Sequence, residues 1–317
     1  MVRGFLVVCC PVLAFGCSFV RIGCNSLGDR ASIVFVGKVL SPEDPATESI
    51  LHGTPILFEV AERLRGEMEQ RINIYEPGTS CDYTFRAGQS YLVFAHLENG
   101  RLTTSELTST RPVLTASALL RQLRALREGR KPAALFGVLS QHSGPSKESP
   151  MADVKIRAIS NKETFTTKSE SDGSFEFGSL APGEYRVKAE LPKVLVPAET
   201  RVLIKRGESC DAETLWTTPD GRISGRVVDR KMTAEPGFLS VFPADLSERD
   251  SLQGYDVGKR GHFEIGPLPP GRYRFIFRAK TASQTPFYYP ERTAQQPNSA
   301  IELGVGQHLD NLTFVLR

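Results

Sequence analysis

An internal repeat constrains the fold of this chain more than any other feature of its sequence. Residues 173–187, GSFEFGSLAPGEYRV, align without a gap on residues 261–275, GHFEIGPLPPGRYRF. A strand-like segment of matching pattern precedes each copy, LFGVL at 135–139 and ISGRVV at 223–228. Because a match of this length indicates duplication, we expect two sister domains to follow one another in the C-terminal part of the chain.

The repeat has the alternation that is typical of strands with one buried face. Its large apolar residues lie two positions apart, which places them on one side of an extended strand. These residues are Phe175, Phe177, Phe263 and Ile265. The glutamates between them, Glu176 and Glu264, then lie on the outer, solvated side. We therefore predict that the repeat fills hydrophobic cores, and we assign neither glutamate a general-acid role.

A Pro-Gly pair follows in each copy, at Pro182-Gly183 and at Pro270-Gly271. Proline presets φ at the second position of a turn, and glycine accepts the positive φ of a type II turn at the third. We expect each pair to turn a hairpin that closes a β-sandwich. No helix start follows the glycines, so the segment does not have the form of a phosphate-binding loop.

Short strands followed by one helix are predicted for the N-terminal part. The strand-like runs are separated by Gly, Pro, Asp and Asn, and they lie at 32–39, 56–60, 72–75, 91–95 and 101–104. Five short strands and a helix predict a small closed barrel.

The helix itself has clear start, face and stop signals. Thr115 or Ser117 can cap it, and Gly129 ends it. Its apolar face is formed by Leu119, Leu120, Leu123 and Leu126, and the arginines expected on the solvated side are Arg121, Arg124 and Arg127.

The first residues, MVRGFLVVCCPVLAFG, have the outline of a secretory signal. One basic residue precedes an apolar stretch, and Gly16 stands before Cys17. The stretch is shorter than the roughly 20 residues of a membrane-spanning helix and contains Pro11, so we expect cleavage rather than an uncleaved anchor. Residues 14–17 also resemble a bacterial lipoprotein processing site, which leaves lipidation of Cys17 open.

Export would move the remaining cysteines into an oxidising compartment and make a disulfide possible. We expect one bridge between Cys81 and either Cys17 or Cys24, which would close a loop of about 60 residues and stabilise the fold by roughly 4 kcal/mol. Cys210 lies far down the chain, in what looks like another domain, and its role stays open. The expected location is secreted, periplasmic or at the cell surface.

Composition argues against several classes of function. The 39 Lys and Arg residues exceed the 36 Asp and Glu residues only slightly, so no nucleic-acid partner is expected. The five histidines are scattered singly, and the cysteines have no metal-ligand spacing, so we expect no metal and no cofactor. The chain has no nucleophile elbow and no Walker loop, and we expect no catalytic residue and no enzyme activity.

The repeat resembles the carboxypeptidase regulatory-like domain, whose signature is the run Gly-x-Phe-x-Phe-x-x-Leu-x-Pro-Gly-x-Tyr. The resemblance implies two prealbumin-like (Ig-like) β-sandwiches, at 133–216 and 220–317. In that family such domains are usually non-catalytic and are appended to exported enzymes, transporters or adhesive surface proteins.

The N-terminal part is similar to the netrin-like barrel of the tissue inhibitors of metalloproteinases, an OB-fold. The similarity rests on Cys17, on VFVGKV at 34–39 and on CDYTFRAG at 81–88. In inhibitory relatives the first cysteine lends its amine and carbonyl to a protease zinc, which would make Cys17 and Ser18 an inhibitory edge.

Two departures from that family weaken the inhibitory assignment. Phe19 stands where the family has its second cysteine, and Leu107 stands near the place of that cysteine's partner. A whole bridge is therefore absent, and the N-terminal edge that an inhibitor holds rigid is loosened. A lipid on Cys17 would also prevent zinc binding by its amine.

Two aromatic features remain. Trp216, near the junction of the two sandwiches, is expected to pack between domains. Phe287, Tyr288 and Tyr289 lie between prolines, which keep the segment out of a central strand. These three rings form either an exposed aromatic binding patch or a packed edge.

The sequence thus predicts an all-β multi-domain protein. It has a signal peptide at 1–16, an OB-like barrel with a docked helix at 17–130, and sandwiches at 133–216 and 220–317. We expect an exported, non-catalytic interaction or scaffolding protein that binds an extracellular or periplasmic protein or polysaccharide. It would meet a membrane only through a lipid at Cys17, and its oligomeric state is open. The alternative is a metalloprotease inhibitor that chelates zinc through Cys17.

Overall fold

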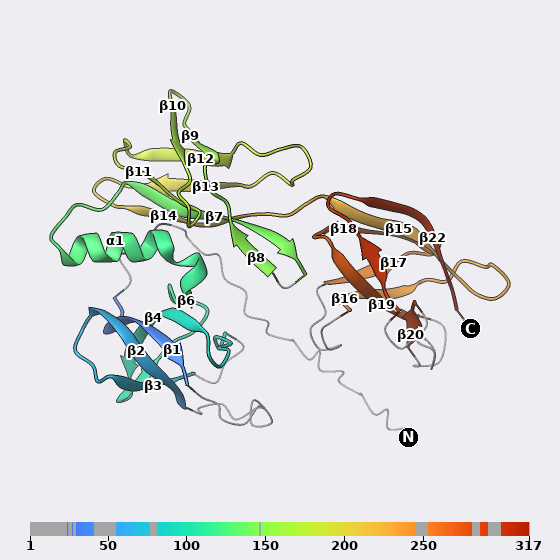
Figure 1. Cartoon of the computed structure of the whole chain (residues 1–317), viewed down its shortest axis with the longest axis horizontal. Helices are drawn as coiled ribbons and strands as arrows, with labels where there is room; N and C mark the ends of the chain where they lie inside the picture. The colour runs from blue at the N-terminus through green and yellow to red at the C-terminus, as the bar shows by residue number, and fades with distance from the viewer. Residues whose placement is uncertain are drawn as a thin grey trace, which may run out of the picture. The chain divides into compact units, whose positions relative to one another are not determined.

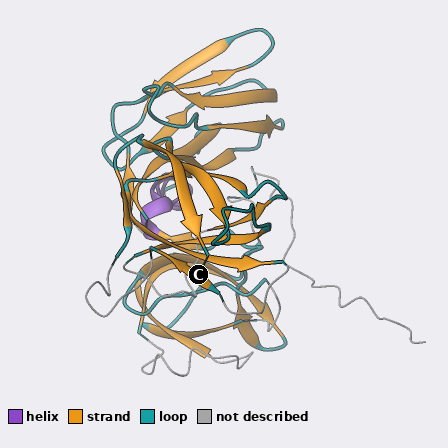
Figure 2. Cartoon of the chain, turned by 90° about the vertical axis from the view of Figure 1, so that its right-hand side faces the viewer, coloured by secondary structure: helices purple, strands orange, loops and turns teal. Residues whose placement is uncertain are grey.

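The computed structural model describes residues 24, 27, 30–40, 55–76, 81–145, 147–244, 253–280, 286–290 and 299–316. The chain divides into two compact units, Met1–Pro132 and Ala133–Arg317, and each is described by itself. Strands dominate the described residues, together with one α-helix (Figures 1 and 2). The predicted all-β multi-domain class is confirmed.

Five strands of the first unit close into a small barrel. In sheet order they are β1 (Ile33–Val39), β2 (Pro55–Arg65), β3 (Arg71–Tyr75), β5 (Arg101–Thr103) and β4 (Ser90–Glu98). β4 pairs with β1 as well as with β5, and this pairing closes the barrel. A short sixth strand, β6 (Arg111–Pro112), adds to β4 at Tyr91 and Leu92. The expected barrel of five short strands is confirmed.

Aromatic rings in edge-to-face contact fill the barrel. The ring centroids of Phe35 and Phe58 are 5.7 Å apart, and Phe85 lies 5.1 Å from Phe58 and 4.9 Å from Tyr91. Phe85 belongs to the CDYTFRAG segment, so this segment contributes to the core. The Tyr91 hydroxyl accepts a hydrogen bond from the Arg86 amide at 3.0 Å and thereby ties the segment to β4.

Two threonine side chains form hydrogen bonds with the backbone of β4 where no strand pairs with it on that side. β4 pairs with β6 at Tyr91 and Leu92 and with β5 from His96 onward, which leaves the backbone of Phe94 between them without a strand partner on that side. The Phe94 amide donates to Thr110 Oγ1 at 2.9 Å, and Thr104 Oγ1 donates to the Phe94 carbonyl at 2.9 Å. Both threonines are buried, so their hydroxyls satisfy backbone groups that would otherwise lose hydrogen bonds.

The helix α1 (Ser117–Arg127) ends as predicted but begins differently. Gly129 has a φ of 72°, and the amides of Gly129 and Arg130 donate to the carbonyls of Leu126 and Ala125 in a Schellman arrangement. At the start, Ala116 is the N-cap, and no side chain caps the helix.

The expectation that Thr115 or Ser117 caps α1 is therefore wrong. Thr115 belongs to a 3-10 turn, η2 (Val113–Thr115), and its hydroxyl donates to the Pro112 carbonyl instead. Leu126 is 42% exposed, so it does not share the buried face of Leu119, Leu120 and Leu123.

Two of the arginines that were expected on the solvated side of α1 attach the helix to β2. Arg124 Nη2 lies 2.6 Å from Glu62 Oε2, and Arg127 Nη1 lies 3.2 Å from Glu62 Oε1. Arg127 also donates to the Arg63 carbonyl at 2.9 Å. The hydrogen bond from Arg124 lowers the pKa of the Glu62 carboxyl below its ordinary value of 4.5.

The first sandwich packs two four-stranded sheets against one another. One sheet is, in order, β10 (Thr164–Lys168), β9 (Lys155–Ile159), β12 (Gly183–Ala189) and β13 (Glu199–Ile204). The facing sheet is β11 (Ser174–Phe177), β7 (Leu135–Gly144) and β14 (Cys210–Thr217), with β8 (Lys147–Pro150) paired to β7. Phe175 and Phe177 are buried and Glu176 is exposed, as their alternation predicts.

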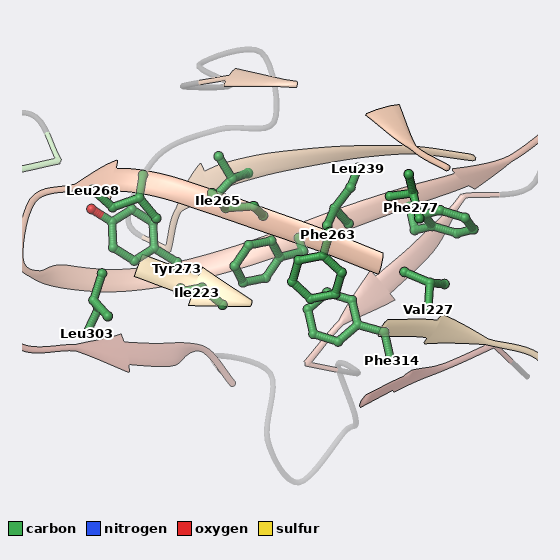
Figure 3. Packing of buried hydrophobic residues seen from close by; sticks show 13 residues of the cluster. Ile223, Val227, Leu239, Phe263, Ile265, Leu268, Tyr273, Phe277, Leu303 and Phe314 are labelled. Carbon is green, nitrogen blue, oxygen red and sulfur yellow. The ribbon is translucent and has the colours of Figure 1, made fainter. Parts of the chain in front are cut away.

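The second sandwich repeats this plan. One sheet is β18 (His262–Leu268), β15 (Gly221–Val228) and β22 (His308–Val315). The other is β17 (Gln253–Val257), β16 (Gly237–Pro243), β19 (Gly271–Ala279) and β20 (Phe287–Tyr289), with β21 (Ile301–Leu303) also on β19. Figure 3 shows its core, in which Phe263, Ile265, Tyr273 and Phe314 meet from both sheets. Glu264 lies outside it and is exposed.

The Pro-Gly segments do not make hairpins, contrary to expectation. β11 and β12 belong to different sheets, and so do β18 and β19, so each segment carries the chain from one sheet across to the other. The strands β12 and β19 begin at the glycines themselves, with a φ of 155° at Gly183 and no positive φ at Gly271. The type II turn is therefore also wrong. Alternation shows which residues face a core, but it does not show whether the next strand joins the same sheet.

A tyrosine corner recurs in both sandwiches. The Tyr185 hydroxyl donates to the Ala181 carbonyl at 3.0 Å, and the Tyr273 hydroxyl donates to the Pro269 carbonyl at 2.6 Å. Each bond spans the crossing from one sheet to the other and ties the crossing segment to the next strand. Tyr273 is fully buried, and this desolvation raises the pKa of its hydroxyl.

A bulge opposite a glycine also recurs. β14 and β22 shift register beside β7 and β15, and positive φ values occur at Glu213 (58°) and Asn311 (62°). A Cβ on Gly137 would lie 2.9 Å from the Glu213 carbonyl oxygen, and one on Gly225 would collide with the carbonyl oxygen of Leu312. The glycines that precede both copies of the repeat are thus required by close approach of the neighbouring strand.

We expect Gly225→Ala to destabilise the second sandwich by about 1–3 kcal/mol, because the new methyl group overpacks against the backbone of β22. Calorimetric unfolding of the full chain should show the corresponding transition at lower temperature. Gly178→Ala is the control, because a Cβ at Gly178 meets no atom within 4 Å. Equal effects of the two changes would contradict the role of the bulge.

We expect Glu62→Gln to loosen α1 by about 0.5 kcal/mol at neutral pH, since exposed ion pairs contribute little more than this. Because the folded-state pKa of Glu62 is lowered, its contribution is present above pH 4.5 and disappears as pH falls below that value. Hydrogen exchange of residues 117–127 should therefore differ between wild type and variant at neutral pH and converge in acid. Glu67→Gln, at an exposed position with no ion pair among the described residues, should leave this exchange unchanged at any pH.

Candidate functional site

The residues of the expected inhibitory edge, Cys17 and Ser18, lie outside the described residues. Cys24 and Cys81, two of the disulfide candidates, are disulfide-bonded, and so is Cys210. Cys210 is fully buried at the start of β14, and the sequence had not assigned it a bond. Structural disulfides persist in oxidising compartments, so the bonded cysteines indicate an extracytoplasmic protein.

The aromatic segment at 287–289 is an edge strand, β20, paired with β19. Tyr289 stacks on Phe314 with ring centroids 3.8 Å apart, and Phe287 also packs against the core. Tyr288 points outward and is 40% exposed. The structure thus separates the three rings between the core and the surface, and they do not form one exposed patch.

Trp216 has a ring partner inside the first sandwich. Its indole stacks on the imidazole of His142, with centroids 4.5 Å apart and planes 9° from parallel. Trp216 lies on β14 and His142 on the neighbouring strand β7, and both are half-buried. The pairing leaves this indole half-covered, which disfavours its use as an open stacking platform.

The outer face of the first sandwich carries an unusual concentration of positive charge. On the sheet β10-β9-β12-β13, basic residues stand directly opposite basic residues in three cross-strand pairs: Lys168 with Lys155, Arg157 with Lys188, and Arg186 with Arg201. We call these six residues the basic face. Like charges in directly opposite positions destabilise a sheet, so this arrangement is unfavourable for folding.

Carboxylates compensate only part of the basic face. Lys168 Nζ lies 2.7 Å from Asp153 Oδ1, and Glu190 pairs with both Lys155 and Arg157. Among the described residues, neither Arg186 nor Arg201 takes part in an ion pair, and both are exposed. The third pair therefore stands as an uncompensated double positive charge.

A groove lies at this uncompensated pair. It has a volume of about 480 Å³ and is open to solvent, and Arg186 and Arg201 both line it. Asn161 and Glu184 add an amide and a carboxylate, and the side chain of Leu203, 50% exposed, adds apolar surface. The groove therefore offers cationic and hydrogen-bonding groups in a shallow, accessible site.

Among the described residues, the matching sheet of the second sandwich has no such pair. Arg274 occupies the repeat position of Arg186 and faces Phe242 on β16, as Arg186 faces Ile159 on β9, but no described basic residue is paired with Arg274 on its other side. Arg278 faces Phe238, and Arg272 faces Glu302 on β21. Opposed cations are therefore no requirement of the shared fold and belong to the first sandwich.

The other sheet of the second sandwich is polar but compensated. Arg222 lies 2.9 Å from Asp220 and 2.7 Å from Glu264, and these contacts raise the pKa of its guanidinium. Ser224 Oγ donates to Asp310 at 2.8 Å. A second hollow of about 480 Å³ lies on this sheet, lined by residues that include His262 and Glu264. Its lining holds one arginine, Arg226, which stands opposite His262, and Glu264 there is ion-paired with Arg222. The groove of the first sandwich holds two arginines that stand opposite one another, so we favour that groove as the candidate site.

Sequence analysis missed Arg186 and Arg201. The alternation of Glu184, Tyr185, Arg186 and Val187 is a signal that Arg186 faces outward. Nothing in the sequence shows that Arg201 stands opposite Arg186, because that depends on the register of β12 with β13.

Neither metal sites nor membrane spans are found within the ranges that the structure describes. No group of three or more His, Cys, Asp or Glu side chains there is placed to hold a metal ion. No helix in the same ranges is long and apolar enough to cross a membrane.

Comparison with known families identifies the first sandwich. Residues 136–215 match the family described as BOS complex subunit NOMO1-like, second beta sandwich domain. The chain therefore carries a β-sandwich domain of this NOMO1-like, carboxypeptidase regulatory-like type, together with a small N-terminal barrel. No curated protein matches the chain.

Several bacterial proteins of known structure, pilins among them, are weakly similar. GBS52, the minor pilin of Streptococcus agalactiae, is 10% identical with a TM-score of 0.23, and the match covers 57% of this chain and 94% of GBS52. The Bacillus anthracis TIE protein is 12% identical with a TM-score of 0.24, over 91% of this chain and 52% of that one. A streptococcal ancillary pilin is 12% identical with a TM-score of 0.21, over 92% and 93%. These scores lie below those of proteins that share an overall fold.

We expect the fluorescence of Trp216 to report on His142. Trp216 is the only tryptophan of the chain, and the imidazole that stacks on it shields one face of its indole from water. His142→Ala removes this ring, so it should shift the emission of Trp216 to longer wavelength. His262→Ala, on the second sandwich, should leave the emission unchanged. Identical emission of His142→Ala and wild type would contradict the stack.

Proposed function

We propose that this chain is an exported, non-catalytic interaction protein that works at the cell exterior, secreted, in the periplasm or on the surface. Its partner is an extracellular or periplasmic protein or polysaccharide, which it binds through the surfaces of its β-domains. One observation carries the proposal: two sandwiches with the same core have outer faces of different charge. The two copies share the pattern of residues that fills the core, while opposed cations occur among the described residues of the first sandwich.

The use of the aromatic residues supports the same proposal. The rings of the repeat are buried in the cores, and the half-buried Phe287 and Tyr289 pack against the core of the second sandwich. The repeat therefore stabilises the two sandwiches in the same way, and the sandwiches differ in the residues on their surfaces. A binding function needs no more than such a surface on a rigid support.

The alternative function is inhibition of a metalloprotease through Cys17. It is supported by the small barrel and by the disulfide-bonded Cys81 of the CDYTFRAG segment, two features that the netrin-like resemblance implies. In this alternative the barrel, rather than the sandwiches, makes the functional contact. A mature chain that begins at Cys17 with a free amine is its first requirement.

The test is binding of the purified mature chain to fractions of the exterior of the producing cell, with protein and polysaccharide fractions kept separate. We expect saturable binding to one fraction, and we expect a version that ends at residue 132 to lose it. Mass spectrometry of the mature N-terminus accompanies the assay. A cytoplasmic, uncleaved chain with reduced cysteines, or one that binds neither fraction, would contradict the proposal. Zinc-dependent inhibition of a metalloprotease by a chain with a free Cys17 amine would favour the alternative.

A further inference from the structure

We propose that Arg186 and Arg201 form a binding site for an anionic polysaccharide, whose carboxylate or sulfate groups they hold in the groove between β9, β12 and β13. The inference deepens the proposed function, on which it rests, by assigning the surface and the chemistry of the ligand. It draws on the register of the sheet, on the missing counter-charges and on the composition of the basic face.

The register places two guanidinium groups within reach of one anion. Arg186 and Arg201 are directly opposite on antiparallel strands, where Cβ atoms lie about 4.5–5.5 Å apart. Each guanidinium presents five N–H donors in a planar fork that matches a carboxylate or sulfate. Two such forks on one side of a sheet can enclose a single anionic group from both sides. The Glu184 carboxylate lines the same groove, but among the described residues neither arginine is ion-paired with it or with another carboxylate.

The missing compensation is specific to this pair. In the two neighbouring basic pairs, Asp153 forms an ion pair with Lys168, and Glu190 forms ion pairs with Lys155 and Arg157. Neither Arg186 nor Arg201 forms an ion pair with a described carboxylate, although an acidic side chain opposite either arginine would remove the repulsion between them. An external anion accounts for a pair that is unfavourable in the free protein.

The arrangement suits a polymer with repeated anionic groups. Arg157 and Lys188 form another cross-strand pair on the same face, between β9 and β12 rather than between β12 and β13. At about 3.4 Å per residue, Lys188 lies about 7 Å along β12 from Arg186. A chain that bears an anionic group on successive units therefore contacts Lys188 as well as the arginine pair.

The basic face favours a polysaccharide over a polypeptide. Protein interfaces are centred on buried aromatic and apolar anchors. Most outward residues of this sheet are instead charged or hydroxyl-bearing, as at Thr164 and Thr166, and the apolar ones among them that line the groove are aliphatic, Ile159 and Leu203. The ring of Phe165 points inward against Tyr185. Asn161 and Glu184 in the groove can exchange hydrogen bonds with sugar hydroxyls. The ligand thus expected is hydrophilic and anionic.

The test compares four polymers on the full chain by titration calorimetry: polygalacturonate, dextran sulfate, neutral dextran and poly-glutamate. We expect binding to polygalacturonate or dextran sulfate, and the arm that binds identifies carboxylate or sulfate as the preferred anion. The double variant Arg186→Gln and Arg201→Gln should weaken it about tenfold or more, as expected for loss of charge-assisted hydrogen bonds. Lys168→Gln, on the same face but already paired with Asp153, should change it by less than about twofold.

A second measurement separates binding from structure. Arg201→Glu replaces a like-charge pair by an opposite-charge pair, so it should raise the unfolding temperature of the first sandwich while it abolishes binding. A lower unfolding temperature would mean that Arg201 serves the fold, and it would overturn the inference.

Three further outcomes would overturn it: equal binding to neutral dextran, tighter binding to poly-glutamate than to either anionic glycan, or no binding to any polymer. If binding to the exterior fraction persists in the double variant, the inference fails while the proposed function stands.

Discussion

Burial of a duplicated aromatic face between two sheets is the interaction on which the C-terminal unit depends. Phe175 and Phe263 sit opposite glycines, Gly137 and Gly225, and these glycines leave room for the ring in one case and for a bulged neighbouring strand in both. Apolar burial supplies the main favourable free energy of such a sandwich. The tyrosine corners then satisfy the backbone where the chain crosses from one sheet to the other. The aromatic core, the tyrosine corner and the bulge opposite a glycine therefore occur together in both sandwiches.

This construction leaves the outer faces free to differ. In a sheet, residues alternate between core and solvent, so the outward positions can change without changes in the core. The first sandwich uses that freedom to oppose Arg186 and Arg201 across β12 and β13, whereas the equivalent Arg274 has no described basic residue opposite it. A binding surface on a rigid sheet loses little conformational entropy when a ligand arrives. The basic face has this property, because its charges project from four paired strands.

Sequence reasoning succeeded where local pattern decides the structure. The period-two alternation located the buried rings and the exposed glutamates, and Gly129 marked the end of α1. It failed where the partner lies elsewhere in the chain. Thr115 does not cap α1, because its hydroxyl donates a hydrogen bond to the Pro112 carbonyl, and Ser117 lies inside the helix as its first residue. The Pro-Gly segments predict hairpins from local turn chemistry. The prediction is wrong because the sheet that a strand joins depends on pairing with distant strands. The domain limits at 130, 133, 216 and 220 stay predictions.

The sequence by itself determined that the chain is built from strands, that two of its domains are sisters, and which residues of the repeat lie inside. Period and repetition encode these properties, since each is a relation between residues that are close in sequence or identical in pattern. Only the tertiary structure decided which side chains stand opposite one another: Arg186 with Arg201, Trp216 with His142, Thr110 with the Phe94 amide. These pairs depend on strand register and loop path, which are set by the packing of the whole core rather than by any local segment.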